Sequence, residues 1–178
     1  MTEPSASGAG AGRRPLACSG GEAAKGAIHA EVLERGFDAR RQTYVGEYDR
    51  PELDGALLLL PVIGMEEPTS PRVVGTVDAV AHELHAGGPF FYRHAPQGEG
   101  AFLPVSFWMV QALAFTGRHD EAQELFEKLL PVGGPLGLLS EEADPTSGDL
   151  LGNYPQALSH AALLQAALAL QSASDLSR

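Results

Sequence analysis

The chain has 178 residues, of which 44% are hydrophobic and 20% charged, so its length and composition fit one ordinary globular domain. Its formal net charge of −11 opposes sequence-independent binding to DNA, RNA or an anionic membrane, because phosphate contacts need clustered lysines and arginines. Cys18 is the only cysteine, which excludes an intrachain disulfide and a thiolate metal cluster.

The two ends of the chain and its hydropathy set the expected boundaries. Residues 1–24 are rich in glycine, alanine and serine and should form a disordered tail, residues 25–172 the folded domain, and residues 173–178 a disordered C-terminus. The N-terminus lacks the apolar core of a signal peptide, and no apolar run reaches the roughly 18 residues of a membrane helix. The sequence therefore predicts a cytoplasmic protein with neither membrane nor nucleic acid as a partner.

The spacing of apolar residues predicts about six helices and no convincing pair of strands. In chain order, the helices are expected over residues 22–35, 53–64, 71–84, 103–115, 119–130 and 156–171. Ser70 followed by Pro71 should cap the third of them, and glycine or proline ends several others. Segments 53–64 and 103–115 are apolar on every side and should be buried on every side, whereas 119–130 has one apolar face. This alternation predicts an all-α domain in which one layer of helices encloses another.

Aromatic and charged side chains gather just before and inside the predicted helix 103–115. Arg93, Glu99, Phe102 and Trp108 fall within 16 positions of one another. A guanidinium group and a carboxylate can bind sugar hydroxyls, and aromatic rings can cover the apolar face of a sugar. The pattern is typical of a sugar site, but a surface loop that leads into a core aromatic residue has the same composition. Both interpretations stay open at this point.

Two adjacent carboxylates, Glu141 and Glu142, end an apolar run in the segment LGLLSEE. Acids in such a position lie half inside a core, where partial desolvation beside a pocket suits a general base. The alternative is a pair of solvated acids at the end of a helix or strand.

The remaining motifs indicate neither a metal nor a cofactor. His82 and His85 are three residues apart, whereas zinc-binding histidines on a helix are four apart, and no third ligand is near. A solvated helix C-terminus, where histidine interacts favourably with the helix dipole, is the better explanation. No glycine-rich phosphate loop follows a strand, and no serine lies in a nucleophile elbow. We therefore expect no metal and no cofactor.

A partial repeat suggests a different class of function, an interaction module without catalysis. Gly117, Ala122 and Phe126 match the second half of a tetratricopeptide-like repeat. Gly152 and Ala157 echo the first two of these at an offset of 35 residues, but no third copy follows. Because such repeats need several copies to bury a continuous core, helical hairpins in general also account for the echo.

Three long motifs follow one another in the second half of the chain: YRHAPQGEGAFLPVSFW, ALAFTGRHDEAQELFEKLL and GLLSEEADPTSGDLLGNYPQALSHAALL. Their order resembles the C-terminal part of the glucoamylase-type glycoside hydrolases, family fifteen. The upstream segments AIHAEVLERGFD, LDGALLLLPVIG and PRVVGTVDAVAHEL match as well, so the resemblance covers about residues 25 to 171. It implies helical hairpins that form part of an (α/α)6 toroid, with an inner ring of apolar helices inside an outer ring.

The resemblance also implies an activity and a set of site residues. The family's members are inverting, exo-acting hydrolases of α-glucosidic bonds, active on starch-type glucans, trehalose or related glucosides. Glu141, which follows a small residue, matches the general base, and Glu142 a neighbouring substrate-binding position. Arg93 matches a sugar-binding arginine, and Glu99 and Phe102 match the pocket wall, although relatives often have an aromatic residue and asparagine there. Trp108 is expected beside the same sugar.

The family's general acid lies upstream of the region that this chain matches. Inverting hydrolysis needs a second carboxyl group roughly 6.5–9.5 Å from the base. We therefore expect a fragment that carries the base, is inactive or nearly so alone, and needs a complementing N-terminal half. Half of a toroid should also expose apolar inner-ring residues such as Leu57 to Leu60, which would promote self-association.

Overall fold

Within residues 19–95 and 98–176, which the computed structural model describes, five α-helices form most of the fold. They are α1 (Ser19–Arg35), α2 (Pro71–Glu83), α3 (Leu103–Phe115), α4 (His119–Leu129) and α5 (Ala157–Leu176), with the 3-10 helices η1 (Gly55–Leu59) and η2 (Leu130–Leu136) between them. The predicted helical class is confirmed. Residues 1–18 and 177–178, predicted to be disordered, lie outside the described residues, while α1 and α5 extend beyond the predicted helices 22–35 and 156–171.

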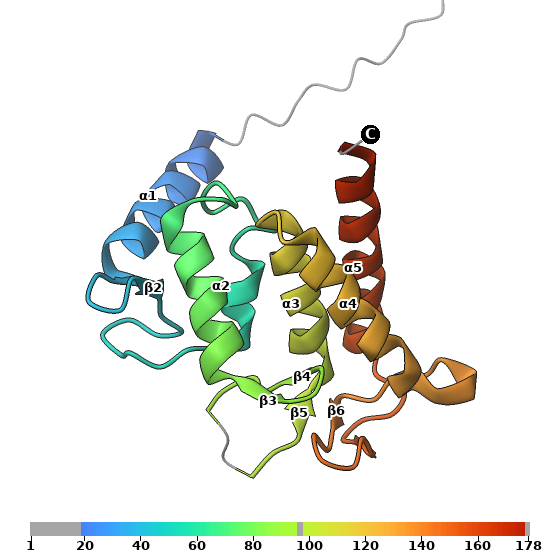
Figure 1. The fold of residues 1–178 in the computed structure, drawn as a ribbon. Helices are drawn as coiled ribbons and strands as arrows, with labels where there is room; N and C mark the ends of the chain where they lie inside the picture. Colours follow the sequence, from blue (N-terminus) through green and yellow to red (C-terminus); the bar gives the residue numbers. More distant parts are fainter. Residues whose placement is uncertain (1–18, 96–97, 177–178) are drawn as a thin grey trace, which may run out of the picture.

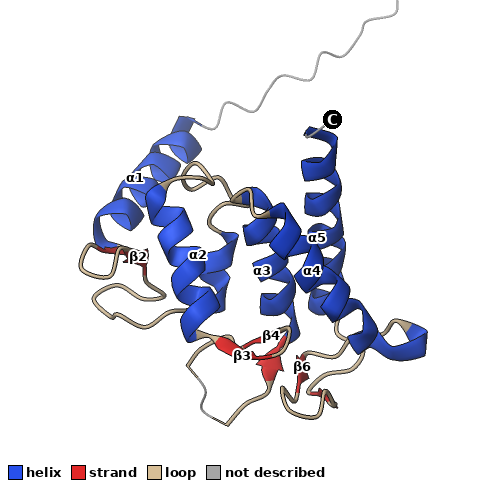
Figure 2. Cartoon of the chain, viewed as in Figure 1, coloured by secondary structure: helices blue, strands red, loops and turns tan. Residues whose placement is uncertain are grey.

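Helices α2, α3, α4 and α5 lie side by side, and the short strands β3 to β6 gather at one end of them, the lower end in Figure 1. Figure 2 shows that the loops at this end are longer than those at the other. None of the described helices combines the length and the hydropathy that crossing a membrane requires.

Helix α3 lies at the centre of the fold. Eleven of its thirteen residues are buried, and it contacts η1, α2, α4 and α5. Helix α4 presents its apolar side to the core, with Ala122 and Leu129 buried. The predicted contrast between an enclosed helix and a one-sided helix is confirmed for this pair. Closure of such helices into a complete toroid stays a prediction.

The prediction that no strands pair is wrong. Three small antiparallel sheets occur among the described residues: β1 (Phe37–Asp38) with β2 (Thr43–Tyr44), β3 (His85–Gly87) with β4 (Phe90–Phe91), and β5 (Ala101–Phe102) with β6 (Glu142–Ala143) and β7 (Leu150–Leu151). Each strand has only two or three residues, too few to produce the alternating pattern by which strands are recognised in a sequence.

The predicted helix over residues 53–64 is wrong in length and in burial. The chain forms only the 3-10 helix η1, whose first turn is capped by Asp54, and then turns at Pro61. Leu58 and Leu60 are buried and Leu57 and Leu59 are half-buried, so the expected exposure of Leu57 to Leu60 is also wrong. Ile63 is instead 70% exposed, which contradicts burial on every side.

Close packing of η1 on α3 requires a glycine at position 55. A Cβ atom added to Gly55 would lie 2.4 Å from Cγ2 of Val105, a branched and buried side chain that cannot move aside. We expect Gly55→Ala to lower the free energy of unfolding by about 1–3 kcal/mol, measured by urea denaturation.

The matched control is Gly26→Ala in the middle of α1, where an added Cβ meets nothing within 4 Å. This variant should be more stable than the wild type by about 0.5–1 kcal/mol, because alanine is the better helix former. Equal stability of Gly55→Ala and the wild type would contradict the packing argument.

Candidate active site

The backbone of Glu141 joins the starts of α3 and α5. Its carbonyl oxygen accepts a hydrogen bond from the Leu103 N–H at 3.0 Å, and its own N–H donates to the Asn153 carbonyl at 2.9 Å. The Gln156 N–H, just before α5, donates to the Leu139 carbonyl at 2.8 Å. Three segments that are distant in the sequence therefore fix the position of one glutamate.

The Glu141 carboxylate is half-buried and is held in one orientation. Its Oε2 atom accepts hydrogen bonds from the Asn153 side chain at 2.8 Å and from the Asn153 backbone N–H at 3.2 Å. Gly152 has φ of 73°, and a Cβ there would lie 3.0 Å from both Cβ and Oε2 of Glu141. Both hydrogen bonds fall on the same oxygen, Oε2, so they fix the orientation of the carboxylate through one of its two oxygens.

Glu142 has different partners from its neighbour. It pairs with Phe102 across β5 and β6, and its Oε2 accepts a hydrogen bond from the Gly100 N–H at 3.0 Å. The buried Ser140 hydroxyl donates to the Glu142 carbonyl at 2.6 Å, and the buried Ser159 hydroxyl donates to the Ser140 carbonyl at 2.6 Å. The two adjacent acids are thus both immobilised, but by separate sets of donors.

The structure brings three of the predicted sugar-binding side chains together. The guanidinium carbon of Arg93 lies 5.9 Å from the centre of the Phe102 ring, and the Phe102 and Trp108 rings are edge to face at 6.4 Å. Phe102 and Trp108 are half-buried. Because Phe102 also pairs with Glu142, these residues lie beside the glutamate pair, as a sugar site requires. Glu99 is exposed, and none of the described contacts joins it to them.

Sequence reasoning missed Asp54. Its Oδ2 atom lies 3.9 Å from Nε of Arg93 and 3.6 Å from Nδ1 of His94, while its Oδ1 accepts the Ala56 N–H at 2.7 Å. The Gly55 N–H donates to the Arg93 carbonyl at 2.7 Å. An aspartate directly before an apolar run is a helix-cap signal, and this signal was available in the sequence.

Sequence reasoning also missed Asn153 and Gly152, which hold the Glu141 carboxylate. A glycine followed by asparagine gave only a turn signal. Among the described residues, no group of three histidine, cysteine or acidic side chains is placed to hold a metal ion.

Replacing Gly152 should displace the Glu141 side chain. Gly148→Ala is the matched control, because Gly148 has a similar φ of 78° but open space around its missing Cβ. Both variants bear the strain of alanine in a left-handed conformation, about 1–2 kcal/mol. The free energy of unfolding of Gly152→Ala should be lower than that of the control by about 1 kcal/mol, because the added Cβ contacts the Glu141 side chain. Urea denaturation of both variants measures the difference, and equal stability would contradict the close contact.

The loop between β6 and β7 should open in acid. The backbone N–H groups of Ser147 and Thr146 donate to Asp144 and lower the pKa of its carboxyl group. The ionised Asp144 carboxylate accepts these hydrogen bonds and so stabilises the loop above roughly pH 4. This stabilisation is lost as the pH falls through the lowered pKa and the carboxylate is protonated. NMR shifts of the Thr146 and Ser147 amides should titrate with a midpoint below about 4, and Asp144→Asn should abolish the titration. A midpoint above that value would contradict the assignment.

The chain is similar to known proteins over most of its length. The family described as "Glycosyl hydrolases family 15" matches residues 9–168. The chain is 38% identical to the trehalase of Thermoplasma volcanium over 151 residues, which cover 82% of the chain and 24% of that protein. It is 41% identical to the trehalase of Mycobacterium tuberculosis over 146 residues, 78% of the chain and 21% of that protein. The chain thus spans about a quarter of the length of these relatives.

Solved structures show the same fold. A wild-type glycosidase superposes with a TM-score of 0.77 at 21% identity, over 89% of this chain and 46% of that one. A glycosidase variant in complex with glucose superposes equally well, at 20% identity. The family match spans most of the chain and includes the Glu141 loop, the helices on either side of it and the Arg93 segment. The chain belongs to glycosyl hydrolase family 15.

Proposed function

We propose that this chain supplies the general base and part of the sugar site of an inverting, exo-acting α-glucoside hydrolase. The observation that carries the proposal is the Glu141 carboxylate, held by Asn153 at the starts of α3 and α5. Family membership and the resemblance of the SEE motif to the family's base motif support the assignment.

In this mechanism Glu141 takes a proton from a water molecule, whose oxygen attacks the anomeric carbon from the face opposite the leaving group. The bond from that carbon to the leaving oxygen breaks, and a second carboxylic acid protonates the leaving oxygen. Asn153 contributes by fixing one carboxylate oxygen, which leaves the other free to accept the proton. The configuration at the anomeric carbon is inverted because only one displacement occurs.

We assign the second carboxylic acid to a part of the domain outside this chain. Glu142 is the immediate neighbour of the base, and its carboxylate accepts the Gly100 N–H, so it is suited to binding rather than to protonating a leaving group on the far side. Since the chain covers only 46% of the matched glycosidase, much of a complete domain is available to supply the acid.

Arg93, Phe102 and Trp108 form the sugar-binding part of the proposed site, with Glu142 and Glu99 as additional polar groups. Arg93 can donate to sugar hydroxyls while its plane packs on Phe102. Among α-glucosides, trehalose is the first substrate to test, because the curated relatives are named trehalases. The glycosidase bound to glucose supports a glucose-sized site.

The tetratricopeptide-like interaction module rests only on the partial repeat at Gly117, Ala122 and Phe126. Arg93 and Glu141 lie at the same end of the helices, joined through Phe102 and Glu142, which fits a carbohydrate site better than a repeat surface. A cytoplasmic location and the absence of nucleic-acid and membrane partners stay predictions.

Glu141→Gln should strongly reduce activity in a reconstituted enzyme. The chain alone should release no glucose from trehalose. Mixed with the part of the Thermoplasma volcanium trehalase N-terminal to the aligned segment, it should do so, and Glu141→Gln should then reduce the rate by about 10²–10⁴-fold. NMR of the first product should show one β-glucose for each trehalose cleaved, because the attacked anomeric carbon inverts.

The matched control is Glu124→Gln, an exposed residue on α4 that is paired with Lys128 and lies outside the site. It should leave the rate unchanged. If turnover survives Glu141→Gln, Glu141 is not the general base. If the chain alone hydrolyses trehalose rapidly, the assignment of the general acid to a part of the domain outside this chain is wrong.

A further inference from the structure

The two carboxylate oxygens of Asp54 have different partners. Oδ1 accepts the Ala56 N–H at 2.7 Å and so caps the first turn of η1. Oδ2 lies 3.9 Å from Nε of Arg93 and 3.6 Å from Nδ1 of His94. Capping a helix needs only one oxygen, so the second oxygen of Asp54 is available to act on the proposed sugar-binding arginine.

Arg93 is held by two consecutive residues. The Gly55 N–H donates to its backbone carbonyl at 2.7 Å, and Asp54 faces its side chain. Gly55 is itself fixed by its close contact with Val105 of α3. On the other side Gly46 packs on Asp54, since a Cβ at Gly46 would lie 3.0 Å from the Cβ of Asp54. The backbone that carries Asp54 is thus fixed, and the capping hydrogen bond fixes its carboxylate.

The contact with Asp54 uses only one edge of the Arg93 guanidinium group. It is made at Nε, and within residues 19–95 and 98–176 no hydrogen bond engages either Nη atom. The guanidinium carbon lies 5.9 Å from the centre of the Phe102 ring, so one face of the group is covered. Arginine has five N–H donors in a rigid planar fork, and the four on the Nη atoms stay available for sugar hydroxyl groups.

The ion pair between Asp54 and Arg93 contributes little to stability. The Arg93 side chain is 54% exposed, and 3.9 Å exceeds the length of a hydrogen bond. Water and salt screen exposed pairs of this kind, and many add nothing measurable to the free energy of unfolding. The pair therefore affects the direction and the charge of the guanidinium group rather than the fold.

The surroundings of Arg93 are negatively charged. A hollow of about 270 Å³ beside Asp54 is lined by Glu47, Glu52 and Arg50, and Arg50 is paired with Glu47 at 3.4 Å. The proposed base and the glutamate after it add two more carboxylates to the site. An arginine without a compensating acid would attract phosphate and carboxylate groups, which are its strongest partners. With Asp54 beside it, Arg93 offers hydrogen bonds without an unbalanced positive charge.

We propose that Asp54 is a positioning residue that acts through Arg93. It directs the free guanidinium donors toward the hydroxyl groups of the sugar. It also balances the arginine's charge, so that the site discriminates against glucosides that carry a phosphate or a carboxylate. The inference rests on the proposed function, because it assumes that Arg93 binds the substrate.

Trp108 allows a direct test with the full chain. It is the only tryptophan and lies against Phe102, so its fluorescence should report sugar binding. Titrations with trehalose and with trehalose 6-phosphate give two affinities, of which the wild type should show the higher for trehalose. Asp54→Asn should weaken trehalose binding about threefold and lower the ratio of the two affinities about tenfold, because the balancing charge is lost.

The melting temperature separates this role from helix capping. Asparagine caps a helix as well as aspartate does, so Asp54→Asn should melt at the same temperature as the wild type. Asp54→Ala loses the cap as well as the charge and should melt at a lower temperature. Unchanged binding by Asp54→Asn would leave Asp54 with the role of helix cap alone.

A double variant shows whether Asp54 acts through Arg93. In an Arg93→Gln background, Asp54→Asn should leave the trehalose affinity unchanged, because there is no guanidinium group to direct. A threefold loss in that background as well would mean that Asp54 binds the sugar itself, and would overturn the positioning role.

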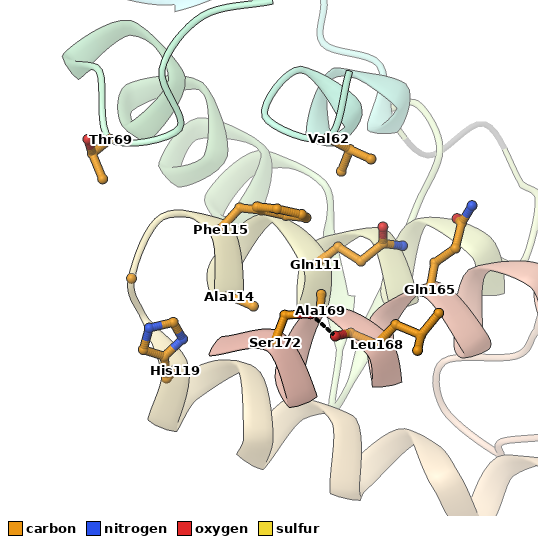
Figure 3. A pocket seen from close by; sticks show the side chains of 11 residues that line it. Val62, Thr69, Gln111, Ala114, Phe115, His119, Gln165, Leu168, Ala169 and Ser172 are labelled. Carbon is orange, nitrogen blue, oxygen red and sulfur yellow. Dashed lines mark hydrogen bonds between the residues drawn. The ribbon is translucent and has the colours of Figure 1, made fainter. Parts of the chain in front are cut away.

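Two variants outside the site serve as controls. Asp78→Asn removes a carboxylate from another arginine, Arg118, whose Nη1 lies 2.7 Å from Asp78, and it should leave both affinities unchanged. Leu168→Gln alters the apolar pocket between α3 and α5, where Figure 3 shows Leu168 among the lining side chains. A change in trehalose affinity in this variant would place the sugar in that pocket and overturn the inference.

The role of Asp54 and the proposed function fail in different ways. If the reconstituted enzyme hydrolyses trehalose but Asp54→Asn changes neither affinity, the role of Asp54 is overturned and the function is kept. If binding depends on Asp54 but no α-glucoside is hydrolysed, the function is overturned and the role of Asp54 is kept. If the wild type binds no trehalose, the sugar site is wrong and the role of Asp54 is overturned with it.

Discussion

The geometry of the site depends on a backbone hydrogen bond, from the first N–H of α3 at Leu103 to the carbonyl of Glu141. The first N–H groups of a helix have no partner within the helix and must be satisfied from outside. Here the partner is the residue that carries the proposed base. The start of η1 repeats the arrangement, because the Gly55 N–H donates to the carbonyl of Arg93. The start of η1 therefore holds Arg93, which lies in the loop before α3. The start of α3 in turn holds Glu141, which lies in the segment before α5.

Burial of α3 makes this arrangement rigid. A helix with eleven of thirteen residues buried cannot shift without disturbing η1, α4 and α5 together. The aromatic residues of the proposed sugar site belong to the same unit, since Phe102 precedes α3 and Trp108 lies on it. Binding groups and proposed base are thus placed by one core rather than by independent loops, which favours fixed distances between them.

The sequence predicted an element correctly where many consecutive residues follow one hydrophobic pattern. Helix 103–115 was predictable because nearly every position is apolar, and 119–130 because its apolar residues repeat at helical spacing. The short strands were not predictable, since two residues carry no period. Leu58 was expected to be exposed because half of a toroid would leave its inner helices uncovered, but it packs against the core. The exposed apolar side chains lie instead on α5, at Leu164 and Leu168.

Among the residues of the proposed site, Glu141 and Arg93 could be predicted because their motifs resemble those of a known family. Asp54 and Asn153 could not, because their roles come from contacts across the fold. Asn153 matters through its hydrogen bonds to Glu141, and Asp54 through its position opposite Arg93 and His94. Such contacts depend on where three loops meet, which local spacing does not encode.

The loop from Asp144 to Asp149 closes on itself. The Asp144 N–H donates to the Asp149 carbonyl, the Gly148 N–H donates to the Asp144 carbonyl, and the Asp144 side chain binds two further amides inside the loop. A segment that satisfies its own polar groups can be lengthened, shortened or replaced without moving β6 or the glutamate before it. Evolution can therefore vary this loop while the geometry around Glu141 is inherited unchanged.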